Sequence, residues 1–258
     1  LALAIGFIVG LERGWHEQAR PADQRQPPRY RMSFDLAEGG DAYCRLEGFF
    51  DTEWAAGVTG DGTTAYADTL ERFRRSVFYL KPDTFLICDD VRVRDARTQR
   101  HLQWLLHSEW PMEETPEGLV IRGERAELHV RPVLPVERAS KFLEDRLPRG
   151  HSSKPVHCWA LRPHWHHIWN VSPSRSPYPQ WNPRGGERLF GPEYPFVVLL
   201  QVARRGERPS WDAEPVEQGS VRGARLRRGE EEVLALLNPE GSPYAFGRLE
   251  TDARQLLV

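Results

Sequence analysis

The chain has 258 residues, of which 40% are hydrophobic, and it contains 9 Trp, 7 Tyr and 11 Phe. That is enough apolar material for one large domain or two smaller ones, and 21 Gly with 21 Pro favour short strands joined by turns over a helical bundle. The formal net charge of −2 gives no general attraction to nucleic acid, so no nucleic-acid partner is expected. Cys44, Cys88 and Cys158 are an odd number without Cys-x-x-Cys spacing, which favours neither a disulfide framework nor a cysteine zinc knuckle.

The first 18 residues differ from the rest of the chain. Residues 1–11 are wholly apolar, but a membrane-spanning helix needs about 20 such residues. Through its Gly-Leu-Glu-Arg-Gly ending, this segment is similar to the first helix of the MgtC/SapB-type membrane proteins, which implies a short apolar helix. Any membrane association is therefore expected only through residues 1–11. Residues 19–29 are polar and rich in proline, and they are interpreted as a linker to a folded domain at 30–258.

The most informative stretch reads Arg-Arg-Ser-Val-Phe-Tyr-Leu-Lys-Pro-Asp-Thr-Phe-Leu-Ile-Cys-Asp-Asp-Val over residues 74–91. It predicts a strand at 76–80, a turn at the Lys-Pro-Asp of 81–83, and a strand rich in β-branched and aromatic residues at 84–93. A third strand is expected at 101–107, with Leu102, Trp104 and Leu106 on one face. Cys88 is expected to be a buried small apolar residue within its strand.

Asp89, Asp90 and His107 are then expected at neighbouring strand ends, and Tyr79 is a further candidate for proton transfer. Carboxylates and an imidazole in that arrangement predict either a metal or proton-transfer site or a polar rim of the sheet. The two interpretations are not separated by the sequence.

Three arginines, Arg72, Arg74 and Arg75, lie close together at the start of the same stretch. A guanidinium group pairs with carboxylate or sulfate through two parallel hydrogen bonds, so an anionic glycan would suit them. The alternative is a solvated strand edge from which arginine side chains extend into water.

The second half of the chain predicts further strands separated by turns. The segment 155–169 holds most of its chemistry, because His164 and His166 share one face of a strand and can chelate zinc, and because Trp165 or Trp169 can pack on sugar rings. Residues 59–63 are predicted to be a turn and residues 140–154 a surface loop. Further strands are expected within 31–36, 42–50, 110–136, 196–202, 219–228, 232–237, 244–249 and 255–258.

The run of residues 74–93 followed by His101-Leu-Gln-Trp-Leu-Leu-His107 resembles the C-terminal β-sandwich part of the heparinase II/III-like polysaccharide lyases. The distinctive pieces are the Lys-Pro turn, the Asp pair and the Trp-Leu-Leu-His strand, and shorter pieces agree in order up to residue 238. The resemblance implies an all-β fold, an antiparallel sandwich or two-layer supersandwich. It also implies a periplasmic or secreted protein whose partner is an acidic, uronate-containing polysaccharide cleaved by β-elimination.

The resemblance also suggests roles for individual residues. Asp90 (or Asp89) and His107 match the positions at which some members hold a divalent metal, here zinc or calcium. From the chemistry of their own side chains, and not from the resemblance, Arg74, Arg75 and Trp165 are the expected substrate contacts. The family places most catalytic groups on a helical toroid that precedes the sandwich, and this chain has no such region in its sequence. A non-catalytic carbohydrate-binding or scaffold module is the alternative function, and a membrane-tethered domain is a weaker one.

Overall fold

The computed structural model describes residues 31–35, 41–66, 70–94, 102–136, 138–143, 157–163, 193–247 and 249–258. The expected all-β antiparallel fold is confirmed, because every strand pair formed by these residues is antiparallel. The apolar segment 1–18, the linker 19–29 and Trp165 lie outside the described residues. In the part of the chain that is described, no helix is long and apolar enough to cross a membrane.

The largest sheet has nine strands in the order β1-β2-β3-β4-β5-β12-β9-β8-β7. Its bounds are β1 Arg31–Asp35, β2 Asp41–Asp51, β3 Ala55–Asp61, β4 Leu70–Leu80, β5 Thr84–Val93, β12 Phe196–Arg204, β9 Ala126–Leu134, β8 Gly118–Arg122 and β7 Met112–Thr115. A short 3-10 helix, η2 (Thr63–Tyr66), follows β3.

Two smaller sheets and one hairpin complete the described fold. The three-stranded sheet has the order β10-β11-β6, the four-stranded sheet the order β13-β14-β15-β18, and β16 pairs with β17. Their bounds are β10 Arg138–Leu143, β11 His157–Pro163, β6 Trp104–Ser108, β13 Asp212–Gln218, β14 Val221–Arg228, β15 Glu231–Leu237, β18 Gln255–Leu257, β16 Tyr244–Phe246 and β17 Leu249–Thr251.

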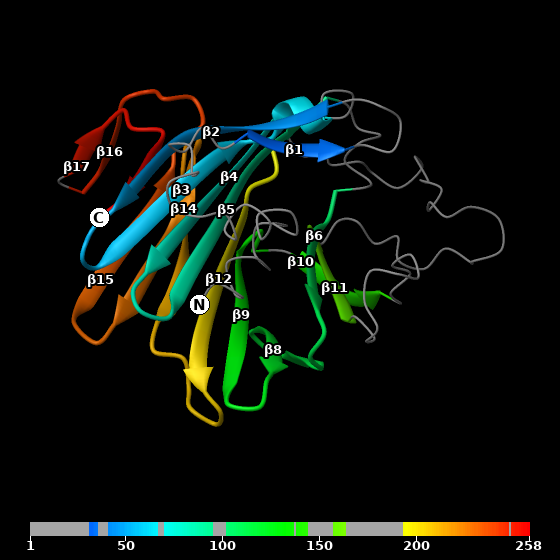
Figure 1. The fold of residues 1–258 in the computed structure, drawn as a ribbon. Helices are drawn as coiled ribbons and strands as arrows, with labels where there is room; N and C mark the ends of the chain where they lie inside the picture. The colour runs from blue at the N-terminus through cyan, green and yellow to red at the C-terminus, as the bar shows by residue number, and fades with distance from the viewer. Residues whose placement is uncertain are drawn as a thin grey trace, which may run out of the picture.

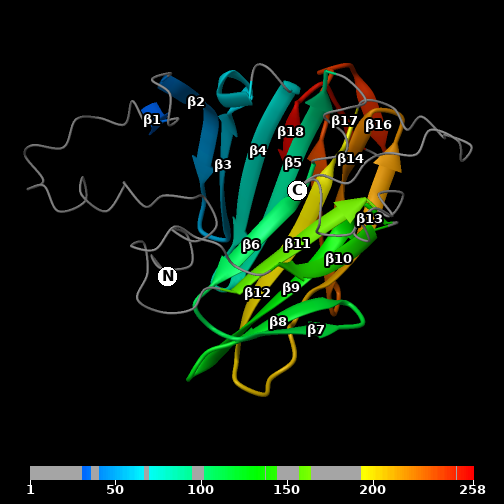
Figure 2. The same cartoon turned by 90° about the vertical axis from the view of Figure 1, so that its right-hand side faces the viewer.

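The nine-stranded sheet is the middle of three layers (Figures 1 and 2). One core lies between it and the three-stranded sheet and joins residues such as Phe85 and Ile87 to Trp104 and Trp159. The other core lies on the opposite face, against the four-stranded sheet. The expected sandwich therefore has three layers and not two, because the middle sheet buries both of its faces.

Strand β5 has the burial that this position requires. Nine of its ten residues are buried, and only Arg92 is half-buried, because both faces are covered by other sheets. Successive side chains alternate, so Phe85 and Ile87 enter the first core while Leu86 and Cys88 enter the second. The predicted turn at 81–83 and the strand at 84–93 are both confirmed, as is the burial of Cys88.

Two local predictions are wrong. Residues 59–61 form the end of β3 and not a turn, because that strand pairs on both sides and the Thr59 hydroxyl donates a hydrogen bond to Ser76 Oγ at 3.0 Å. Residues 140–143, expected within a surface loop, belong to β10, which pairs with β11 along its length. In both places pairing with a distant strand overrides the local turn composition.

Candidate functional site

Asp89 and Asp90 are consecutive residues inside β5, so their side chains point to opposite faces of the middle sheet. Asp89 lies on the face shared with Phe85 and Ile87, and Asp90 on the face shared with Leu86 and Cys88. Both are buried, with exposed fractions of 2% and 8%. The predicted polar rim is therefore wrong, because the pair lies within the sheet and beneath other layers.

Asp89 is held by Arg75, the residue directly opposite it on β4. Arg75 Nε lies 2.6 Å from Asp89 Oδ1, and Arg75 Nη2 lies 2.7 Å from Oδ2. This two-point pairing fixes the guanidinium plane. The Arg75 Cζ atom also lies 5.7 Å from the centre of the Phe73 ring, and Tyr66 meets that ring edge-on at 5.3 Å between centroids.

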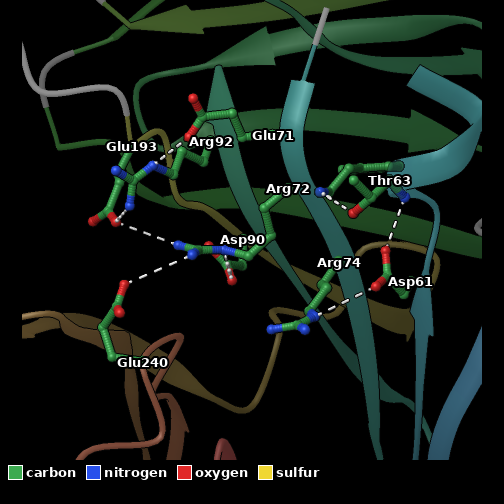
Figure 3. A network of polar contacts seen from close by, with 10 residues as sticks. Asp61, Thr63, Glu71, Arg72, Arg74, Asp90, Arg92, Glu193 and Glu240 are labelled. Atoms are coloured by element: carbon green, nitrogen blue, oxygen red, sulfur yellow. Dashed lines mark hydrogen bonds and ion pairs between the residues drawn. The ribbon is translucent and has the colours of Figure 1, made fainter. Parts of the chain in front are cut away.

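Asp90 belongs to a second cluster on the opposite face, centred on Arg72 (Figure 3). Arg72 Nε lies 2.7 Å from Asp90 Oδ2, and its terminal nitrogens lie 3.3 Å from Glu193 and 3.7 Å from Glu240. Glu193 comes from the segment before β12, and Glu240 from the turn between β15 and β16. One guanidinium therefore joins the middle sheet to two segments that are distant in sequence.

Two more arginines extend this cluster along the sheet. Arg92 pairs with Glu71 at 2.8 Å and with Glu193 at 3.6 Å. Arg74 Nε lies 3.8 Å from Asp61 Oδ2 (Figure 3). The solvated strand edge considered for these arginines is wrong, since β4 is an inner strand between β3 and β5.

The cluster shifts the proton affinity of Asp90. Burial disfavours the ionised carboxylate and raises the pKa of Asp90, while Arg72 and Arg74 oppose this shift. For Arg72, burial lowers the pKa, but the nearby Asp90, Glu193 and Glu240 outweigh it and keep the guanidinium charged. The ion pair therefore holds a carboxylate whose burial is unfavourable.

His107 lies in a different sheet from Asp90. On β6, Trp104 and Leu106 enter the core against the middle sheet, so Leu105 and His107 face away from it. Asp90 also points away from the three-stranded sheet, on the far face of the middle sheet. The structure does not bring Asp90 and His107 together, because a packed core lies between them.

The described residues do not fit a divalent ion held by Asp90 and His107. They contain no group of three or more His, Cys, Asp or Glu side chains that could hold a metal ion. The Asp90 carboxylate is also occupied by a guanidinium at 2.7 Å, where an ion would have to compete with a positive charge. His164 and His166 lie outside the described residues.

The arginines predicted to contact substrate have protein partners. Arg75 is paired with Asp89 and Arg74 with Asp61, so part of each guanidinium serves the fold. The Arg75 side chain remains 32% exposed, whereas that of Arg72 is 15% exposed. Of the three arginines, Arg75 thus keeps the largest exposed fraction.

Sequence reasoning missed the carboxylates that surround Arg72. Glu193 lies in a Gly-Pro-Glu-Tyr-Pro piece and Glu240 in an Asn-Pro-Glu-Gly turn, and neither was singled out as a charged partner. The register of β4 against β5 places Arg72 opposite Arg92 and two residue pairs from Asp90, but it could not locate the two glutamates. Only the tertiary fold brings them together.

A third buried carboxylate among the described residues, which sequence reasoning also missed, lies on β9. Glu127 is 4% exposed, and its Oε1 accepts a hydrogen bond from Arg122 Nη1 at 2.6 Å. His129 Nε2 lies 3.8 Å from Glu127 Oε2, and burial lowers the pKa of this histidine. Arg122 also donates to Glu113 at 2.9 Å. This cluster joins β7, β8 and β9 near one edge of the middle sheet.

Comparison with known proteins finds structural alignments at low sequence identity. No family model matches the chain, and no curated protein matches it. Among solved structures, a heparan sulfate lyase from Pedobacter heparinus aligns with a TM-score of 0.48 and 10% identity over 75% of this chain. A heparinase III aligns with a TM-score of 0.47 and 10% identity over 73%. This chain spans 28% and 26% of the lengths of those two proteins.

Proposed function

We propose that this chain is the C-terminal β-sandwich part of a heparinase II/III-like polysaccharide lyase, and that it contributes to the handling of an acidic, uronate-containing glycan. The observation that carries the proposal is where the residues of the resemblance lie. The run 74–93 forms the β4–β5 pair in the interior of the middle sheet, and the Trp-Leu-Leu-His piece forms β6 against its face. Residues that were grouped only by sequence pattern thus contribute to one core.

This part of the protein is not expected to cleave a glycan by itself. β-Elimination requires a group that neutralises the uronate carboxylate, a base that removes a proton, and an acid that protonates the leaving oxygen. Among the described residues, the candidate carboxylates Asp89 and Asp90 are bound to arginines, and His107 lies in another layer. Tyr79 is also engaged, since its hydroxyl donates to the Pro82 carbonyl at 2.7 Å. The reacting groups are therefore expected elsewhere, on a helical part.

A non-catalytic carbohydrate-binding module is the second candidate, and a specific observation favours it. Several large aromatic side chains are substantially exposed, with Trp54, Tyr66 and Trp110 at 49%, 50% and 45%. Exposed aromatic faces are the surfaces on which sugar rings stack. The two candidates share the glycan partner and differ in whether a catalytic part works with this sandwich. A periplasmic or secreted location belongs to both.

The test measures binding and cleavage separately. The purified chain is mixed with heparan sulfate, with an unsulfated uronate polysaccharide and with a neutral glucan, and binding is followed by affinity electrophoresis. Cleavage is followed by the ultraviolet absorbance of the unsaturated uronate that β-elimination creates. We expect retardation by the acidic glycans without an increase in absorbance. Equal retardation by the neutral glucan, or none by any acidic glycan, would contradict the proposal.

A further inference from the structure

Among the described residues, the guanidinium of Arg75 has an exposed edge to which no role has yet been given. Its Nε and Nη2 atoms are committed to Asp89, at 2.6 and 2.7 Å. Within the part of the chain that the structure describes, Nη1 has no hydrogen-bond partner, and it is not among the buried unsatisfied atoms. A guanidinium carries five N–H groups, so the edge formed by Nη1 and the second Nη2 hydrogen remains available.

The guanidinium is held rigidly in this orientation. Asp89 binds one edge of the guanidinium through two hydrogen bonds, and the Phe73 ring centre lies 5.7 Å from Cζ. A cation that is already fixed loses little conformational entropy when a ligand binds, which distinguishes it from a flexible surface arginine.

Gly60 and Val58 of β3 (the Gly60–Val58 shelf) lie beside Arg75, and the Tyr66 ring lies against Phe73 nearby. On the β3 side the register partner of Arg75 is Gly60, which has no side chain to cover the guanidinium. Val58 follows on the same face and is 40% exposed. Tyr66 contacts the ring of Phe73, two residues before Arg75 on β4, edge-on, and it is 50% exposed.

We propose that Arg75, Tyr66 and the Gly60–Val58 shelf form a subsite for one acidic sugar residue of a glycan. The free guanidinium edge would bind the sulfate or carboxylate through two parallel hydrogen bonds. The apolar face of the sugar ring would lie on Val58 and against Tyr66. This subsite rests on the proposed function, since it specifies where the acidic glycan is contacted.

The opposite face of the same sheet supplies a contrast. Arg72 has a carboxylate partner on β5, as Arg75 does, but Asp90, Glu193 and Glu240 surround it and only 15% of its side chain is exposed. An anion approaching Arg72 would meet this carboxylate excess. Arg75 has one carboxylate partner among the described residues and an exposed edge, so it is the better anion contact.

The experiment titrates the full chain with a heparin oligosaccharide, an unsulfated heparosan oligosaccharide and a neutral malto-oligosaccharide of the same length. The first variant is the double change Arg75→Gln with Asp89→Asn, which leaves the net charge unchanged and replaces an ion pair with an amide pair. The second is Tyr66→Ala, at a side chain exposed enough to be removed without opening a core. The control is Arg227→Gln, at an exposed, ion-paired arginine on β14.

Calorimetry gives the affinities, and the Nε–H resonance of Arg75 reports the contact in the wild-type protein. We expect the double variant to weaken acidic-oligosaccharide binding about tenfold. We expect Tyr66→Ala to weaken it about threefold and Arg227→Gln to leave it within about twofold. A shift of the Arg75 resonance with heparin alone identifies sulfate as the bound group, and a shift with both acidic probes identifies the carboxylate.

The failures are distinguishable. If the wild-type protein binds acidic oligosaccharide, Arg227→Gln weakens that binding and both subsite variants bind as the wild type does, the subsite is overturned and the proposed function stands. An Arg75 resonance that does not move at saturating acidic oligosaccharide would do the same, even where the double variant fails to fold. Absence of binding to either acidic probe would overturn the proposed function and the subsite together.

Discussion

Arg75 and Asp89 face each other across β4 and β5 and form two parallel hydrogen bonds of 2.6 and 2.7 Å. The carboxylate of this pair is almost fully buried, with 3% of its side chain exposed, whereas the guanidinium is 32% exposed. The pair is thus anchored at its acidic end and open at its basic end. Removing the arginine therefore affects the fold differently from neutralising both partners.

Arg75→Ala is expected to lower the free energy of unfolding by roughly 3 kcal/mol, because it leaves a buried carboxylate without a partner. The double change Arg75→Gln with Asp89→Asn should cost less than this single change, since neither partner then carries an uncompensated charge. Urea unfolding measures both values. Arg131→Ala, whose partner Asp212 is 91% exposed, is the control and should cost about 0.5 kcal/mol or less in its ion pair. A double variant that is less stable than Arg75→Ala would contradict this account.

Gln201 is expected to hold the four-stranded sheet against the middle sheet. Its side-chain amide donates to the Trp211 carbonyl and accepts from the Trp211 N–H, both at 2.8 Å and both buried. Gln201→Leu keeps the volume but leaves two buried backbone groups unpaired, so a loss of about 2–4 kcal/mol is expected in thermal or urea unfolding. Gln218→Leu removes one exposed hydrogen bond to Ala245 and is the matched control. Equal losses of unfolding free energy in the two variants would show that the buried hydrogen bonds to Trp211 stabilise the protein no more than an exposed one does.

We expect the protein to lose stability in acid, in part because Glu127 becomes protonated. Burial raises the pKa of this carboxyl, but Arg122, the Gly206 backbone and His129 together outweigh it, so the folded pKa lies below the unfolded value near 4.5. Its contribution is therefore present above about pH 4.5 and is lost as the pH falls through the folded pKa. Glu127→Gln should flatten the dependence of unfolding free energy on pH in this acidic window.

The control for the acid effect is Glu113→Gln, which removes the other carboxylate on Arg122. Because Glu113 is 62% exposed, its replacement should leave the pH dependence close to that of the wild-type protein. If the free energy of unfolding changes with pH equally in the Glu127→Gln variant and the wild-type protein below about pH 4.5, Glu127 does not cause the loss of stability in acid.

Local sequence pattern was sufficient for the central strands. The alternation in residues 104–107 reflects burial directly, because only one face of that strand enters a core. The nearly continuous apolar run in residues 84–93 instead reflects a strand that is covered on both faces. The same reasoning placed the turn at 81–83. It failed at 59–61, where glycine and threonine indicated a turn, because pairing with two neighbouring strands determines the conformation there.

The partners within the charged clusters could not be predicted from sequence pattern, for a different reason. The consecutive residues Asp89 and Asp90 look alike in sequence, yet alternation sends them to different cores and different arginines. Their partners are set by strand register, and Glu193 and Glu240 approach Arg72 only through the packing of separate segments. Asp90 and His107 were linked by their expected strand ends, but the order of the sheets places them in different layers.

Gly223 on β14 provides a test of how tightly the four-stranded sheet is built. A Cβ atom at this position would overlap the carbonyl oxygen of Ala235 on the neighbouring strand, and a backbone atom cannot move aside as a flexible side chain can. Gly223→Ala is therefore expected to lower the free energy of unfolding by about 2–3 kcal/mol. Gly229→Ala is the control, because a Cβ there meets nothing within 4 Å and only the positive φ of 61° opposes the change. That conformational strain should cost about 1 kcal/mol in urea unfolding. If the Gly229 variant were the less stable of the two, the close approach of β14 and β15 at Gly223 would not constrain this sheet.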